Sequence, residues 1–304
     1  MSSPQGEREN CNDGRVVSGD APLRLRQLSL AELLDETFRI YRKAFPLFFG
    51  IALAVSIPTL LIVLVFGVYT FAGGQSFNTP EFRSDPSTIF KSSAFVSLLV
   101  GLVVAAVVSL FLVPFSYGAP VRAAIDVALG HRPTFRSVLA ATARRYFGLW
   151  GAAIVYGLVI FLLSITIIGI PVAIWIYVRW VLFVPAMLTE NLSPIRALGR
   201  SWTLVEGKWW RTCGILLLLL LLLYIVGLII GTLFQFVGAL IPGLSQDARL
   251  AVNQVGSSLG GVVAAPIQYI AWTLMYFDLR VRKEHFDLDQ LAAQVGSTGP
   301  SPVG

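Results

Sequence analysis

The chain has 304 residues, of which 56% are hydrophobic and only 13% charged, and its mean hydropathy is +0.74. This composition leaves too few polar residues to cover a water-soluble domain of this length, and it excludes that class. The net charge is +6, and Cys11 and Cys213 are too few and too poorly placed for a disulfide framework or a metal site. We therefore expect an integral membrane protein with no cofactor and no nucleic acid partner.

Six apolar stretches follow a polar N-terminal segment, and each has about 20 residues or more, the length that crosses a bilayer as a helix. They lie at 45–72, 94–117, 148–168, 171–189, 212–241 and 255–277. Residues 1–28 and 291–304 are predicted to be disordered tails. The fold class is thus an all-α, polytopic helical bundle, with its membrane domain over residues 29–290.

Lysine and arginine are distributed unevenly between the two sides that this topology creates. Of the 23 basic residues, 19 fall on the side of both termini and three on the other, where the polar connector 73–93 lies. By the positive-inside rule, both termini are predicted to be cytoplasmic.

A short amphipathic segment precedes each odd-numbered span, at 29–50, 133–151 and 193–211. In the first, Ser29 and Glu32 form a predicted capping box. In the third, Ser193 is the predicted N-cap and Pro194 takes the first helical position. Each segment ends with cations beside aromatic residues, which we expect at the lipid headgroups: Lys43, Arg145, Lys208, Trp209, Trp210 and Arg211. We predict a unit of one interfacial helix and one transmembrane hairpin, used three times.

Arg179 is the one basic residue inside a predicted span, ~12 Å from Pro171 at ~1.5 Å per residue, near the bilayer centre. A cation facing lipid at that depth costs ~2.5–3.5 kcal/mol, so we expect it to face the bundle interior. Gln235 and Gln268, in two other spans, are the predicted partners. Two interpretations stay open: a polar cavity for an anionic headgroup, or a lock between the fourth span and the last two.

No motif of a known catalytic class occurs in the sequence: GxSxG, HExxH and the phosphate-binding P-loop are all missing. We therefore expect no enzyme. The first hypothesis is a component that binds or moves phospholipid-related amphiphiles, or that anchors a partner protein on the cytoplasmic face. A small-solute transporter and a structural scaffold without a ligand are the alternatives. The sequence does not fix an oligomeric state.

Three stretches, 28–53, 185–211 and 275–292, resemble bacterial proteins called glycerophosphoryl diester phosphodiesterase membrane-domain proteins. The resemblance implies a bacterial inner-membrane location and a link to lipid metabolism. Some relatives also carry a catalytic phosphodiesterase domain, which we do not expect here because the spans and their collar segments occupy nearly all of the chain. The residues that match the family's motifs are Arg179, Pro185, Glu190, Pro194, Ser201, Trp202, Gly207, Trp210, Arg211, Asp278, Arg280 and Lys283.

Overall fold

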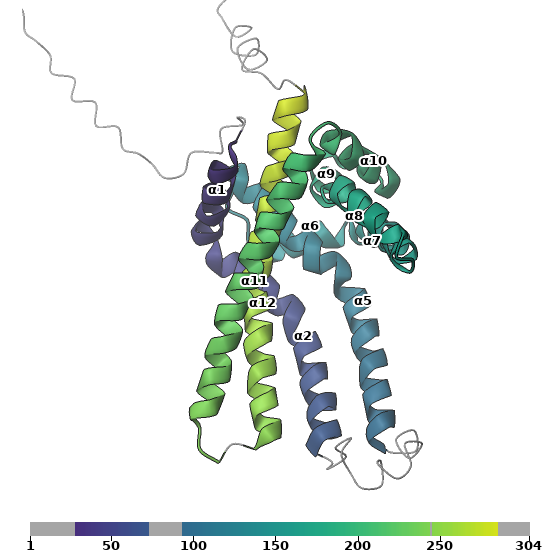
Figure 1. Ribbon diagram of the computed structural model, residues 1–304. Helices are drawn as coiled ribbons and strands as arrows, with labels where there is room; N and C mark the ends of the chain where they lie inside the picture. The colour runs from purple at the N-terminus through teal and green to yellow at the C-terminus, as the bar shows by residue number, and fades with distance from the viewer. Residues whose placement is uncertain (1–27, 73–92, 244, 285–304) are drawn as a thin grey trace, which may run out of the picture.

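The structure is a computed structural model that describes residues 28–72, 93–243 and 245–284 (Figure 1). Its helices are α1 (Leu30–Lys43), α2 (Phe45–Ala72), α5 (Ser93–Ala128), α6 (Phe135–Ala143), α7 (Tyr146–Ser164), α8 (Gly169–Trp180), α9 (Phe183–Glu190), α10 (Pro194–Val205), α11 (Trp209–Leu240) and α12 (Gln246–Glu284). Within these ranges six stretches are long and apolar enough to cross a membrane: α2, α5, α7, α8 with α9, α11 and α12. The predicted all-α class with six spans is confirmed. The predicted tails, apart from Leu28, and the connector before Ser93 lie outside the described residues.

Four long helices, α2, α5, α11 and α12, run alongside one another (Figure 1). The short helices α1, α6 and α10 gather at one end of them, which we call the collar end; α12 finishes there, and the opposite end is the far end. The α7–α8 hairpin leans away from the four long helices, and Ile167 and Ile168 at its turn are each 87% exposed. The far parts of the long helices and this hairpin therefore present apolar side chains outward, as lipid requires.

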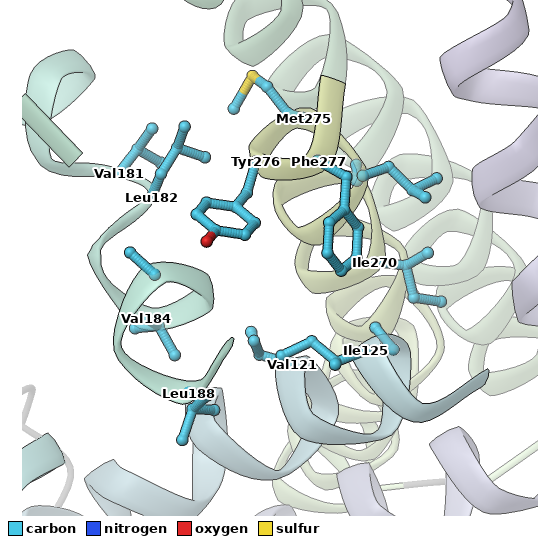
Figure 2. Packing of buried hydrophobic residues seen from close by; sticks show 14 of the residues in the cluster. Val121, Ile125, Val181, Leu182, Val184, Leu188, Ile270, Met275, Tyr276 and Phe277 are labelled. Atoms are coloured by element: carbon cyan, nitrogen blue, oxygen red, sulfur yellow. The ribbon is translucent and has the colours of Figure 1, made fainter. Parts of the chain in front are cut away.

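The buried core lies at the collar end, where α5 and α12 run beyond the predicted spans. Their 36 and 39 residues correspond to ~54 and ~58 Å, well over the ~30 Å of hydrocarbon. Figure 2 shows Tyr276 of α12 extending toward Leu182 and Val184, with Val121 and Ile125 of α5 nearby. At the collar end the helices thus pack around a buried hydrophobic core like that of a water-soluble domain.

The fourth predicted span consists of two helices, because the chain breaks between Trp180 and Phe183. Pro185 lies in the first turn of α9, where a backbone N–H has no intrahelical acceptor, so the proline is tolerated there. Ser201 of α10, fully buried, donates to the carbonyl of Arg179 (2.7 Å) and accepts from the N–H of Leu182 (3.1 Å). One hydroxyl therefore satisfies two backbone groups that the break leaves without helical partners.

Each short helix precedes two membrane segments, as the predicted repeat requires. The capping box of Ser29 and Glu32 is present, and Thr134 and Ser137 form a second one at α6. Ser193 is the N-cap of α10 but makes no side-chain cap hydrogen bond. Element order alone does not establish structural equivalence, so the threefold repeat stays a prediction.

Close approach of α11 and α12 depends on glycine. A Cβ atom at Gly256 would lie 2.4 Å from the side chain of Phe234, and one at Gly260 would lie 3.5 Å from Ile230. Small residues spaced by four let helix backbones approach in membranes, where close packing rather than water exclusion drives association. These glycines fix the last two spans against each other.

Candidate functional site

Arg179 lies against two tryptophan rings near the end of α8. Its Cζ atom is 4.6 Å from the ring centre of Trp175 and 4.4 Å from that of Trp202. The two rings are nearly perpendicular, at 88°, with centres 4.9 Å apart. Trp175 comes from the preceding turn of α8, and Trp202 from α10. We call Arg179, Trp175 and Trp202 the arginine cage.

The described residues give the cage a cation but no counter-ion. Within the described part of the chain Arg179 forms no salt bridge, and its Nε atom is buried without a hydrogen-bond partner. Each cation–π contact contributes ~0.5–2 kcal/mol, so two are of the same order as the ~2.5–3.5 kcal/mol cost of inserting an arginine. The rings therefore offset much of the cost of burying this cation, and no described residue supplies its counter-ion.

The predicted partners of Arg179 differ from the observed ones. Gln235 is exposed on α11, toward the far end, and Gln268 is half-buried on α12; neither forms a hydrogen bond with Arg179 among the described residues. Trp175 and Trp202 were not among the predicted partners, because an aromatic ring face is not a hydrogen-bond acceptor of the expected kind. Trp175 could have been found, because residues four apart share a helix face.

The start of α11 holds the cage from one side. The indole N–H of Trp209 donates to the carbonyl of Trp175 over 3.3 Å. Its neighbour Trp210 is 83% exposed, and Lys208, the N-cap of α11, is exposed as well. An exposed cation and an exposed amphipathic ring therefore flank, in the sequence, the tryptophan that contacts α8.

The other predicted headgroup residues have different surroundings. Lys43 is exposed at the end of α1, and Arg145 donates to Oδ1 of Asn191 over 2.6 Å. Arg211 points inward: its guanidinium donates to the carboxylate of Asp278 (2.5 Å) and to the carbonyl of Leu28 (2.7 Å). Its described contacts are structural ones.

Asp278 is the centre of a buried ionic cluster that the sequence did not reveal. Its side chain is fully buried and accepts from Arg211, from Nε of Arg282 (2.9 and 3.0 Å) and from the N–H of Leu28 (2.8 Å). Arg282 also donates to the carbonyl of Leu28 (2.7 Å). We call Asp278, Arg211, Arg282 and Leu28 the collar clasp; it ties the start of α1, the start of α11 and the end of α12 together.

A second cluster positions α10, which carries Trp202. Arg200 donates through Nε to both carboxylate oxygens of Glu190 (2.9 and 3.0 Å), and the Tyr276 hydroxyl donates to Glu190 (2.6 Å). The Nζ atom of Lys283 donates to two carbonyls at the end of α10, those of Thr203 and Glu206. Two fixed charges on α9 and α12 thereby hold α10, and with it one wall of the cage.

The cage suits anion binding. A guanidinium has five N–H donors and no acceptor, so Arg179 offers only donors to a ligand. Both rings lie on the same side of Arg179, and the planar guanidinium is a group to which phosphate or carboxylate oxygens bind in pairs.

Comparison with known proteins bears on these clusters. Residues 151–289 match the family described as the membrane domain of glycerophosphoryl diester phosphodiesterase. No curated protein and no solved structure matches the chain. The matched part contains the whole cage and Asp278, whereas α1, α2 and α5 precede it. Over residues 151–289, this multi-pass chain is therefore similar to the membrane domain of glycerophosphoryl diester phosphodiesterase.

Proposed function

We propose that this protein is a non-enzymatic membrane component that binds the anionic headgroup of a phospholipid-related amphiphile at the arginine cage. One observation carries the proposal: Arg179 is a half-buried cation that has no counter-ion among the described residues and that lies over the rings of Trp175 and Trp202. A lipid phosphate would supply the missing negative charge while its acyl chains stay in the bilayer.

The surroundings favour an amphiphile over a free anion. Tryptophan rings with one apolar and one polar side prefer the headgroup level of a bilayer. Trp210 is highly exposed, and Trp175 and Ile174 are 39% and 53% exposed. A ligand at the cage therefore meets both a cation and an apolar surface, which matches a headgroup joined to acyl chains.

We further propose that the collar end faces the cytoplasm of a bacterium, across its inner membrane. The bias of basic residues toward this end supports that orientation. The family's description, which names a phosphodiesterase of glycerophosphoryl compounds, supports a ligand from glycerolipid metabolism. Anchoring of a partner enzyme at the collar end is compatible with the same arrangement.

Lipid retention by variants of the full chain tests the proposal. Purified protein would be placed in nanodiscs that contain phosphatidylglycerol and phosphatidylcholine, and the lipids retained after extraction would be identified by native mass spectrometry. We expect wild type to retain phosphatidylglycerol selectively. Arg179→Leu should lower this retention about tenfold, because a charge-assisted contact to phosphate is lost. Arg196→Leu, at an exposed cation of α10, is the matched control and should leave retention unchanged.

Arg179→Lys separates binding from a purely structural lock. Lysine keeps the charge but lacks the planar guanidinium, so it should retain part of the lipid with normal folded yield. If Arg179→Leu abolishes folded protein and no variant changes lipid selectivity, the cage is a lock and the proposal fails. Solute flux into liposomes without lipid selectivity would support the transporter instead.

A further inference from the structure

A cavity of about 390 Å³ lies between the middle of α2, the middle of α5 and the far-end half of α12. It continues into a smaller cavity of about 100 Å³ that reaches Pro120, Pro266 and Tyr269. Ser56 and Ser116 line both cavities. The larger cavity is partly open at its side, so it forms a recess in the helix bundle rather than a sealed void.

Each of the three helices directs two uncharged polar side chains into the larger cavity. They are Ser56 and Thr59 of α2, Ser109 and Ser116 of α5, and Gln254 and Ser258 of α12. The separations of three, seven and four residues place both members of each pair on one face of their helix. No charged side chain lines either cavity among the described residues. The recess is therefore polar but neutral.

The hydrogen bonds of these side chains differ from those elsewhere in the chain. Six other helical hydroxyls donate to the carbonyl four residues earlier: Thr37, Thr142, Ser164, Thr212, Thr232 and Thr273. This is the usual way in which a membrane helix satisfies a hydroxyl. Of the six cavity residues, only Ser116 makes such a local bond, to the carbonyl of Val113 at 2.7 Å. The side chains of the other five have no protein partner in the described part of the chain.

Two prolines add backbone acceptors next to these donors. Pro120 cannot donate to the carbonyl of Ser116, and Pro266 cannot donate to that of Val262. Both prolines line the smaller cavity. Polar groups without partners are unfavourable in hydrocarbon, so a site with five of them requires a partner that brings both acceptors and donors.

We infer that this recess is a second binding site, for the glycerol and ester groups of an uncharged diacylglycerol. Its ester carbonyls would accept from the serine, threonine and glutamine side chains, and its free hydroxyl would donate to an unpaired carbonyl. An ionic headgroup is excluded because nothing in the lining would balance its charge. Exposed apolar residues flank the recess on α2 and α5, including Leu61, Val107 and Phe111, and they supply the contact surface for acyl chains.

This site is independent of the arginine cage. α2 and α5 precede the part of the chain that matches the family, and the cage lies on α8 and α10. The two sites also select opposite ligand classes, one anionic and one neutral. Either proposal can therefore fail without the other.

Photocrosslinking with a neutral lipid tests the inference. The full chain would be incorporated into phosphatidylcholine nanodiscs that contain a photoreactive diacylglycerol, and the adducts would be mapped by mass spectrometry. We expect adducts on α2, α5 and α12 around the recess. The double variant Ser109→Ala/Ser258→Ala should lower the adduct yield about tenfold, because two donors to the ligand are lost.

Two controls make the result decisive. Thr232→Ala removes a hydroxyl of α11 that is exposed and already bonded to its own helix, and it should leave the yield unchanged. Equal yields for the double variant and wild type would overturn the inference. So would an identical labelling pattern with a photoreactive alkane, because the probe would then report only that these helices face lipid.

Discussion

Replacing Asp278 by asparagine removes the negative charge of the collar clasp while keeping the shape of the side chain. The carboxylate is fully buried and lies between two guanidinium groups and one backbone N–H. Asparagine offers a single acceptor oxygen, and its NH₂ group would face donors. Arg211 and Arg282, both at least three-quarters buried, would then lose their counter-ion.

The expected loss follows from the surroundings of this carboxylate. Removing one partner of a buried ion pair destabilises a protein by ~3–5 kcal/mol, because the remaining charge stays buried. Here two arginines share one acid, so we expect Asp278→Asn to lower the free energy of unfolding by ~3–5 kcal/mol. The matched control is Glu36→Gln, which breaks the exposed pair with Arg39 (2.5 Å, 50% exposed at the arginine). Such surface pairs contribute under ~1 kcal/mol.

SDS titration in mixed micelles, followed by tryptophan fluorescence, measures both variants under the same conditions. The clasp joins the starts of α1 and α11 to the end of α12, so its loss should also free the N-terminal segment. Limited proteolysis should then cleave near Leu28 faster in Asp278→Asn than in wild type. A loss no larger than that of Glu36→Gln, with unchanged proteolysis, would show that the clasp does not hold the collar end together.

Three further predictions concern helix contacts. Ser201→Ala leaves two buried backbone groups unsatisfied and should cost ~1–3 kcal/mol, whereas Thr203→Ala on the exposed side of α10 should stay within ~0.5 kcal/mol in the same titration. Trp202→Leu removes one face of the cage and should weaken phosphatidylglycerol retention severalfold, read by native mass spectrometry, without loss of folded protein. Gly256→Ala should lower the unfolding temperature because its Cβ meets a side chain of α11, whereas Gly214→Ala, with open space around it, should raise it.

The spans could be predicted because hydrocarbon imposes both length and composition on them. Their ends could not, because hydropathy falls where charged residues begin while the helix itself continues. In α5 the charges are Arg122 and Asp126, which pair one turn apart over 2.9 Å. Because the two charges neutralise each other within the helix, α5 continues to Ala128. The collar core arises from such extensions.

The interior position of Arg179 followed from the cost of a cation in lipid, but its partners did not. The partner expected for a buried cation is a hydrogen-bond acceptor at equal depth, and the sequence offers two glutamines there. The structure compensates the charge with ring faces, and Trp202 reaches it only because α10 folds back onto α8. That approach depends on Ser201 and on the break before Phe183, neither of which hydropathy or periodicity encodes.

The acids that close the even-numbered spans explain how the chain combines a rigid part with an adaptable one. Asp126, Glu190 and Asp278 each pair with an arginine at the collar end, and the last is fully buried. Cooperative units with many buried contacts open last, and regions with few buried contacts open first. The membrane-crossing stretches of α2 and α5 are only 11% buried inside the protein, and they line the neutral recess. A lipid in the proposed recess would therefore contact the part of the protein with few buried contacts, away from the ion pairs that hold the collar end and the arginine cage.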